Sequence, residues 1–354
     1  MSSKAAPFLS ASRLEDILAR LPSLRIVVLG DFFLDKYLVT DPALSERSIE
    51  TGLEARQIVE IRCSPGAAGT VANNLAALGV GQINAVGVIG DDGQGYELKR
   101  ELEKIRVDTC RLIRSSDRLT PTYTKPMVRR DGHEDELERL DIKNRRPLQP
   151  DLETGVISNL RDALAGPDAD ISAVIIADQV QERNCGVVTD GVRQCLESLA
   201  EEYLKVLFFA DSRCRIGEFH GVTVKPNQHE AAHALGRESS DVSGLDQAKS
   251  DGVELAMRSG ITVFLTVGDQ GILVCGESSC VHVPTIPADG PIDIVGAGDS
   301  ATAGIVCALC AGAAPEEAAM MGNLCASVTI RKLGTTGTAS PDELREMLGR
   351  SCLT

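Results

Sequence analysis

The chain has 354 residues, of which 43% are hydrophobic, 25% charged and 3% aromatic. This composition is typical of a folded globular protein, and the length is compatible with one large α/β unit. Thirty-six basic against fifty-one acidic residues give a formal net charge of −15, so the chain lacks the positive field that would gather nucleic acid or an anionic membrane. We therefore expect small-molecule partners, with no nucleic acid and no membrane among them.

The cysteines and the N-terminus indicate the compartment. The eleven cysteines follow no framework spacing, which favours reduced thiols and predicts a cytoplasmic protein. Cys307 and Cys310 form one C-x-x-C, but they lie in an alanine-rich segment, where buried small residues are a better interpretation than a metal or redox site. The N-terminal segment has no apolar run of signal-peptide length, and no stretch approaches the ~20 apolar residues of a membrane-spanning helix.

The first 22 residues predict a short amphipathic helix. Leu14, Ile17, Leu18 and Leu21 fall on one helical face, and Pro22 ends the pattern. We expect residues 1–22 to form a helical lead-in and residues 23–350 to form the main domain.

The main domain alternates between buried strands and helices. Residues 24–30 form an apolar run that ends at Gly30 and delivers Asp31, the pattern of a buried parallel strand with a carboxylate at its carboxyl end. Further strands are predicted at 84–90, 173–177, 206–210, 222–224 and 262–267, and helices at 68–79, 93–106, 186–204 and 246–259. This alternation predicts a doubly wound, mostly parallel α/β sheet.

Two segments leave this alternation. Residues 36–63 and 121–141 show period-2 patterning with charged tips, which predicts hairpin-type strands outside the main sheet. They could form a lid over the carboxyl edge of the sheet or be ordinary surface hairpins.

The strongest local signal is the segment 291–304, PIDIVGAGDSATAG. An apolar run leads into Gly296, Ala297 and Gly298, and a helix of small residues begins near Asp299. Such a turn at a helix N-terminus directs several N–H groups to one point and favours an anion, so we expect a phosphate site there, with an ionised Asp299 beside the reacting phosphoryl group. The segment also matches a dinucleotide fingerprint, but an acidic side chain would repel a pyrophosphate; close helix packing is the other alternative. No G-x-x-x-x-G-K-[ST] occurs, which excludes a P-loop kinase.

A second motif suggests different chemistry. Residues 229–233 read His-Glu-Ala-Ala-His, a formal match to the H-E-x-x-H of zinc hydrolases, in which His229 and His233 would ligate zinc and Glu230 would act as base. Ser239 stands where the longer form of the motif needs its third histidine. A zinc hydrolase therefore remains a remote alternative.

Taken in chain order, five segments resemble the ribokinase-like (PfkB) carbohydrate kinases. They are GDFFLDKYLV at 30–39, PGAAGTVANNLAALG at 65–79, KPNQHE at 225–230, TVGDQG at 266–271 and DIVGAGDS at 293–300. The resemblance implies a ribokinase-like doubly wound sheet with a small β lid, and the transfer of a phosphoryl group from ATP with Mg²⁺ to a sugar. Within the family, the segments are most similar to kinases of D-glycero-β-D-manno-heptose 7-phosphate.

The resemblance also implies roles for individual residues. The base would be Asp299, beside an anion site formed by Gly296, Ala297 and Gly298. Sugar contacts would come from Asp31, Asp35, Gly66, Ala67, Thr70, Asn74, Arg139 and Asp178. Nucleotide contacts would come from Lys225, Asn227, Glu230, Thr266, Gly268, Gly271 and Asn323. Glu230 and Asn227 would lie near Mg²⁺ without ligating it directly, and Asp293 marks a candidate K⁺ site.

The chain departs from the family pattern in ways that leave the substrate open. Ala67 replaces a glycine, Thr70 an asparagine and Val295 a threonine, and residues 178–184 lack the family's lysine, for which Arg183 is a candidate substitute. A heptose 7-phosphate, phosphorylated at its anomeric hydroxyl, is the expected acceptor; ribose, fructose and ketodeoxygluconate types are alternatives, as is a non-catalytic sugar or nucleotide sensor of the same fold. The resemblance also implies a homodimer.

Overall fold

The computed structural model describes residues 8–130, 133–166, 170–237, 244–288, 290–334 and 336–351. Residues 1–7 of the expected lead-in, residues 131–132 of the second expected excursion and Ser239 of the zinc motif lie outside these ranges. Helix α1 (Ala11–Arg20) is capped by Ser10, whose hydroxyl accepts a hydrogen bond from the backbone amide of Arg13. Leu14, Ile17 and Leu18 of α1 are buried, because they form the apolar face that the sequence predicts.

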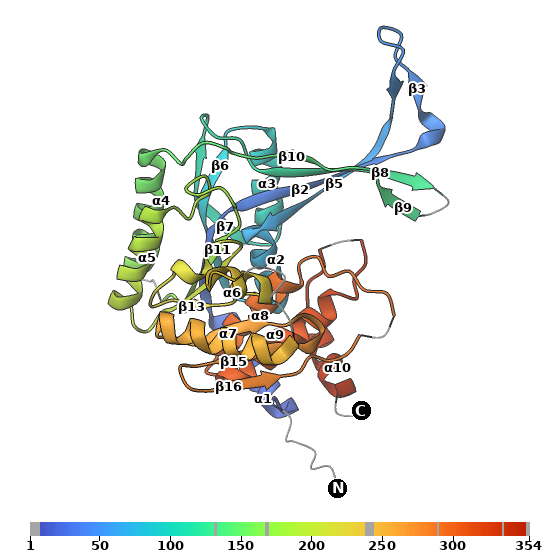
Figure 1. The fold of residues 1–354 in the computed structure, drawn as a ribbon. Helices are drawn as coiled ribbons and strands as arrows, with labels where there is room; N and C mark the ends of the chain where they lie inside the picture. The colour runs from blue at the N-terminus through green and yellow to red at the C-terminus, as the bar shows by residue number, and fades with distance from the viewer. Residues whose placement is uncertain are drawn as a thin grey trace.

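One large sheet organises the molecule (Figure 1). Within the described residues its strand order is β16-β15-β14-β13-β12-β11-β1-β6-β7. The strands are β1 (Arg25–Gly30), β6 (Gln82–Gly90), β7 (Val107–Ser115), β11 (Ala173–Asp178), β12 (Leu207–Ser212), β13 (Thr223–Val224), β14 (Val263–Thr266), β15 (Ile272–Cys275) and β16 (Cys280–Val283). From β14 to β7 all neighbouring strands are parallel, whereas β15 pairs antiparallel with both β14 and β16.

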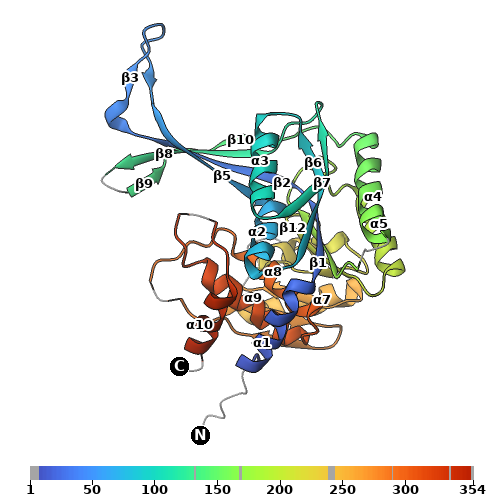
Figure 2. The ribbon, with the colours of Figure 1, turned by 180° about the vertical axis from the view of Figure 1, so that it is seen from behind.

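Helices cover both faces of this sheet (Figures 1 and 2). They are α2 (Ala68–Leu78), α3 (Gly93–Lys104), α4 (Pro150–Ala165), α5 (Asp190–Glu202), α6 (Gln228–Ala234), α7 (Gly244–Ser259), α8 (Ala297–Cys310), α9 (Pro315–Thr329) and α10 (Pro341–Ser351). Side chains of β1 alternate between the two cores: Ile26 and Val28 pack with α1, α2, α3, α8, α9 and α10, while Val27 and Leu29 pack with α4 to α7. The doubly wound α/β prediction is confirmed.

A second sheet stands away from the main body (Figure 1). It contains β2 (Phe32–Thr40), β5 (Ile58–Ala67), β8 (Thr122–Arg130) and β10 (Leu140–Ile142) in the order β10-β8-β2-β5, and β9 (His133–Glu136) also pairs with β8. A short ladder of β3 (Glu46–Arg47) and β4 (Glu54–Ala55) forms the far end of the β2–β5 arm. The two segments that leave the strand–helix alternation in the sequence supply these strands.

The parallel strands bring acidic residues to one edge. Asp31 directly follows β1, Asp178 ends β11, and Asp211 lies near the end of β12, paired with Ala177. The carboxyl ends of neighbouring parallel strands meet at the same edge of a sheet, where open α/β sheets bind ligands. Among the described helices, none is long and apolar enough to cross a membrane.

Candidate active site

A cavity of about 1710 Å³ opens at this edge, between the main sheet and the second sheet. It is lined by these residues of the sequence prediction: Asp31, Asp35, Gly66, Ala67, Thr70, Arg139, Lys225, Asn227, Glu230, Thr266, Gly268, Gly271, Gly296, Ala297, Gly298, Asp299 and Asn323. Asn74, Asp178 and Asp293 are not part of the lining. The structure therefore gathers most of the predicted residues, from segments spread over the chain, around one space.

Asp299 lies in the first turn of α8, which begins after Gly296. Gly296 has φ +80°, and a Cβ there would lie 2.7 Å from Cγ2 of Thr336, so glycine is required at this turn. Burial and, next, the charge of Asp211 raise the pKa of Asp299 to about 7. The sequence predicts an ionised Asp299, and the structure adds that burial of the carboxyl and repulsion by neighbouring acids oppose its ionisation.

The turn before Asp299 lies next to a buried ion pair. Nζ of Lys225 is 2.9 Å from Oδ2 of Asp211 and 3.7 Å from the position that a Cβ on Gly298 would occupy. Burial is the largest single influence on Lys225 and lowers its pKa, but Asp211, Glu230 and Asp299 together outweigh it, so that the pKa is raised. Sequence reasoning missed Asp211, although it follows the apolar run 206–210 just as Asp31 follows 24–30.

Glu230 forms hydrogen bonds with Asn227 at the start of its own helix, which the zinc-hydrolase interpretation does not predict. Its Oε2 accepts the amide of Asn227 at 2.8 Å, and the Asn227 side chain accepts the amide of Glu230 at 2.9 Å, so the two form the capping box of α6. Burial and Asp211 raise the pKa of Glu230 to about 7. His229 and His233 are exposed, and no group of three His, Cys, Asp or Glu side chains in the described ranges is placed to hold a metal. The geometry gives the zinc hydrolase alternative no support.

The second sheet contributes a mixed acidic and basic wall. Asp35 on β2 lies against Gly66 on β5, where a Cβ would be 2.7 Å from Oδ2 of Asp35. Nζ of Lys125 on β8 is 3.9 Å from Oδ1 of Asp35 and lies over the Tyr37 ring. Burial raises the pKa of Asp35, and Lys125 opposes this. Gly66 thus leaves the space that the Asp35 carboxylate needs beside the backbone.

Ala67 and Thr70 mark the start of α2. Ala67 has φ +54° and ψ −118°, a conformation that L-residues rarely adopt. Thr70 is buried and its hydroxyl donates to the carbonyl of Pro65 at 3.4 Å. Asn74, one turn later, donates its side-chain amide to the carbonyl of Thr70. The side chain of Asn74 is buried in α2 and lies outside the cavity lining, so the geometry does not support its contact with the sugar, which stays a prediction.

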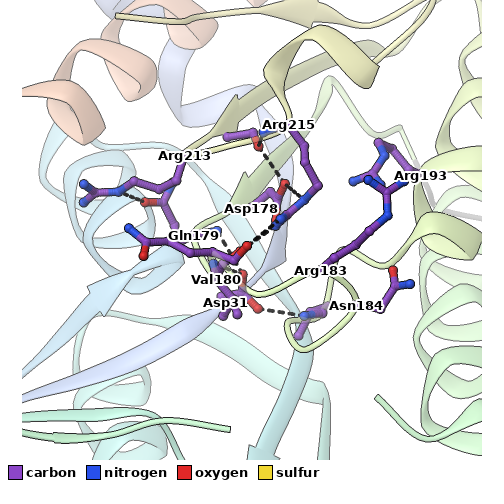
Figure 3. Close-up of polar contacts among 12 residues, drawn as sticks. Asp31, Asp178, Gln179, Val180, Arg183, Asn184, Arg193, Arg213 and Arg215 are labelled. Carbon is purple, nitrogen blue, oxygen red and sulfur yellow. Dashed lines mark hydrogen bonds and ion pairs between the residues drawn. The ribbon is translucent and has the colours of Figure 1, made fainter. Parts of the chain in front are cut away.

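Asp31 holds the loop that follows β11. Its Oδ2 accepts the amides of Gln179 and Val180, and its Oδ1 accepts the amide of Val187 at 2.7 Å. Burial and Asp178 raise the pKa of Asp31 to about 6, although these three hydrogen bonds lower it. Asp31 lines the cavity as expected, but its oxygens already bond the protein backbone (Figure 3).

Asp178 is buried under the same loop. Arg215 donates Nη2 to its Oδ1 at 2.7 Å and Nε to its Oδ2 at 3.2 Å, and the hydroxyl of Ser212 also donates to Oδ2. Asp178 lies outside the cavity lining and its carboxylate is paired with Arg215, so the geometry does not support the sugar contact, which stays a prediction. Arg183, the candidate substitute for the missing lysine, pairs with Asp190 and Glu218 and does not line the cavity.

The remaining predicted residues come from the C-terminal part of the chain; Gly271 and Asn323 line the cavity, whereas Asp293 does not. Gly271 has φ +102°, and a Cβ there would lie 2.3 Å from the carbonyl oxygen of Val283. Asn323 on α9 donates its side-chain amide to the carbonyls of Val283 and Pro284. Asp293 accepts the amide of Val295 at 3.0 Å; the K⁺ site near it stays a prediction.

Comparison with known proteins agrees with this geometry. Residues 221–343 match the pfkB family carbohydrate kinase model. The bifunctional protein HldE of Trichlorobacter lovleyi is 29% identical over 335 residues, which are 93% of this chain and 64% of that protein. HldE of Gluconobacter oxydans is 29% identical over 329 residues, 92% of this chain and 64% of that protein. The chain thus spans less than two thirds of the length of these relatives.

Solved structures share the fold. Phosphofructokinase-2 from Escherichia coli, in complex with substrates and products, has a TM-score of 0.69 at 20% identity and covers 92% of this chain and 99% of its own. Arabidopsis thaliana ribokinase, complexed with ribose and ATP, has a TM-score of 0.65 at 16% identity over 92% of this chain and 98% of its own.

The fold and the matched segment define the class: a ribokinase-like α/β protein. Within that fold, residues 221–343 carry the match to the PfkB carbohydrate kinases that the sequence motifs in this range predict, and the HldE proteins are similar over most of the chain.

Proposed function

We propose that the protein catalyses ATP-dependent phosphorylation of a hydroxyl on a sugar or sugar phosphate. The observation that carries the proposal is the position of Asp299 in the first turn of α8, at the wall of a cavity of about 1710 Å³ that is lined by residues of both the main sheet region and the second sheet. An acceptor oxygen would form a bond to the γ-phosphorus while the bond from that phosphorus to the bridging oxygen breaks, and Asp299 would take the acceptor proton. The amides of Gly296, Ala297 and Gly298 would stabilise charge on the transferring group.

The charge balance of the site supports an accompanying divalent cation. Asp211, Glu230 and Asp299 all act on the charge of Lys225, and burial together with the charge of Asp211 raises the pKa of Glu230 and of Asp299 to about 7. This surplus of carboxylate oxygen fits Mg²⁺, which keeps several waters and binds through few carboxylates together with substrate phosphates. Glu230 and Asn227 would hold such an ion through water, and the ion would supply neutralisation of phosphate charge.

The acceptor half of the cavity supports a phosphorylated sugar. Lys125, Arg139 and Lys143 line this part of the wall, and Arg139 and Lys143 lie over the Tyr123 ring at 4.4 and 5.9 Å from its centroid. Their ion-pair partners are Asp35 and Asp141, so three cations stand against two carboxylates, and this surplus of positive charge suits an acceptor that already carries a phosphate. Together with the motif resemblance, this favours a heptose 7-phosphate acceptor.

The second sheet is proposed as the lid and as the contact with a second copy. It faces the cavity through Asp35, Gly66 and Tyr123, so its closure would exclude water from the reacting phosphoryl group. Ile58, Ile61 and Leu140 on this sheet are 49, 55 and 54% exposed. Covering exposed apolar residues on such edge strands favours pairing of two chains, and we propose a cytoplasmic homodimer.

The test is ADP release from Mg-ATP with a panel of acceptors headed by D-glycero-D-manno-heptose 7-phosphate, with Asp299→Asn in parallel. Turnover on the heptose phosphate that the substitution lowers by two to four orders of magnitude would support the proposal. Turnover on ribose, fructose or ketodeoxygluconate alone would keep the kinase and change the acceptor. Sugar binding without any turnover would favour a sensor, and a near-normal rate of Asp299→Asn would remove Asp299 as base.

A further inference from the structure

Arg213 occupies a distinctive place on the cavity wall. It directly follows β12, and its backbone amide donates to the carbonyl of Asp178 at 3.1 Å. Its side chain is exposed and lines the cavity. Arg215, two residues later, is buried and turned toward Asp178, whereas Arg213 is turned toward Gln179 (Figure 3). The two arginine side chains therefore lie in different environments, Arg213 at the cavity wall and Arg215 in the protein interior.

One edge of the Arg213 guanidinium is fixed by the loop. Its Nε donates to Oε1 of Gln179 at 3.1 Å. Gln179 is itself fixed, since its backbone amide donates to Oδ2 of Asp31 at 2.9 Å. A chain of hydrogen bonds thus runs from the buried Asp31 carboxylate to the guanidinium, which lowers the entropy lost when Arg213 binds a ligand.

The other edge of the guanidinium is available. In the part of the chain that the structure describes, neither terminal amino group of Arg213 has a hydrogen-bond partner or ion pair. The other arginines of the cavity wall differ: Arg118 donates both terminal groups to the carbonyls of Arg146 and Cys185, and Arg139 forms a two-bond pair with Asp141. A guanidinium with two free parallel donors matches two oxygens of a phosphoryl group.

The positive charge of Arg213 acts on carboxyl groups of the proposed reacting centre. The Arg213 cation lowers the pKa of Asp299 and also that of Glu230, so it acts on both carboxyl groups of the nucleotide side. Lys225, the other cation that does so, is already paired with Asp211. A free cation near Asp299 is suited to the charge of a phosphoryl group in transfer.

We propose that Arg213 binds the γ-phosphoryl group of ATP through its two free terminal amino groups and is a catalytic residue of the transfer. This inference deepens the proposed function and rests on it. Gln179 is the positioning residue, because its Oε1 accepts the hydrogen bond from Nε of Arg213.

The experiment compares nucleotides that differ by the γ-phosphoryl group. Binding of ADP and of the β,γ-methylene analogue of ATP, each with Mg²⁺, is measured by calorimetry on the unaltered protein, Arg213→Met, Arg213→Lys and Arg258→Met. Arg258 is the matched control, since it is an exposed, ion-paired arginine outside the cavity. Arg213→Met should weaken the analogue by about tenfold to a hundredfold and ADP by less than twofold. Arg213→Lys should recover part of that loss, and Arg258→Met should change neither.

Turnover with the best acceptor gives a second reading. Arg213→Met should lower kcat by about a hundredfold, as removal of one donor to a developing charge does in other enzymes, with the acceptor KM nearly unchanged.

An equal loss for ADP and the analogue, no loss for either, or a raised acceptor KM alone would overturn the role of Arg213. If the unaltered protein binds the analogue but phosphorylates no sugar, and Arg213→Met still loses the analogue selectively, the assigned contact stands and the proposed acceptor fails. If the unaltered protein binds neither nucleotide, both proposals fail.

Discussion

Nζ of Lys225 lies 2.9 Å from Oδ2 of Asp211, and both residues are buried. The hydroxyl of Thr302 on α8 also donates to that Asp211 oxygen at 3.2 Å, so the pair connects the ends of β12 and β13 to the helix that carries Asp299. Lys225 is a buried cation that acts on the carboxyls of Asp211, Glu230 and Asp299, while Arg213 at the cavity wall acts on the last two. Both the stability of the site and the protonation of its acids therefore depend on Lys225.

Replacing Lys225 by methionine should destabilise the protein. The change leaves the buried Asp211 carboxylate without its cation, which costs about 3–5 kcal/mol of the free energy of unfolding. Urea-induced unfolding measures this loss, with Lys249→Met as the control because Lys249 pairs with Asp246 at an exposed position. The double change Asp211→Asn with Lys225→Met should recover part of the loss, since it removes the unpaired charge. A loss below about 1 kcal/mol would contradict the buried-pair interpretation.

The rate should depend on pH near neutrality. The base must be deprotonated, and the pKa of Asp299 is raised to about 7 by burial and by Asp211. We therefore expect kcat/KM, which reports the free enzyme, to fall as pH decreases below about 7 and to level off above it. Asp211→Asn should move this midpoint to lower pH, because Asp211 raises the pKa of Asp299. A flat profile from pH 5 to 8, or a midpoint that Asp211→Asn leaves in place, would show that another group controls the rate.

The acceptor phosphate can be tested through Lys125 and Arg139. If these cations bind a phosphate already present on the sugar, Lys125→Met and Arg139→Met should each raise the KM for the phosphorylated acceptor by about tenfold, the cost of one charge-assisted hydrogen bond. The KM for the corresponding sugar without phosphate should change little. Arg145→Met is a suitable control, because Arg145 is exposed and absent from the cavity wall. Equal effects on both acceptors would indicate that the cations only support the second sheet.

The sequence predicts the sheet and the Asp299 turn because both depend on local patterns. The apolar runs that end at Gly30 and at Ala210 identify strands, and Gly296 and Gly298 identify the turn. Strands β15 and β16 and helix α4 lie outside the predicted elements, because four-residue apolar runs and a mixed helix give weak periodicity. Expected helix 186–204 begins later, at Asp190, since Thr189 caps it.

The roles of polar side chains are harder to predict, because long-range partners decide them. Arg213 and Arg215 lie two residues apart, yet one is exposed in the cavity and the other is buried against Asp178. Nothing local separates them; their partners lie more than thirty residues earlier in the chain. Asp178 is a similar case. The sequence motif around it predicts a sugar contact, because the motif gives no sign of the distant Arg215 that pairs with the Asp178 carboxylate in the fold.

The backbone conformation at Ala67 suits glycine better than alanine. With φ +54° and ψ −118° it lies where L-residues are strained by about 1–3 kcal/mol, whereas glycine adopts such angles freely but loses about 0.5–1 kcal/mol more entropy on folding. Ala67→Gly should therefore stabilise the protein by about 1 kcal/mol, read as a higher midpoint of urea unfolding. Ala68→Gly is the matched control: Ala68 is the first residue of α2 and is buried, so losing its methyl group there should destabilise. If both variants lower the midpoint, the backbone at Ala67 stores no strain, and the alanine at this cavity wall would then be explained by contact with the ligand.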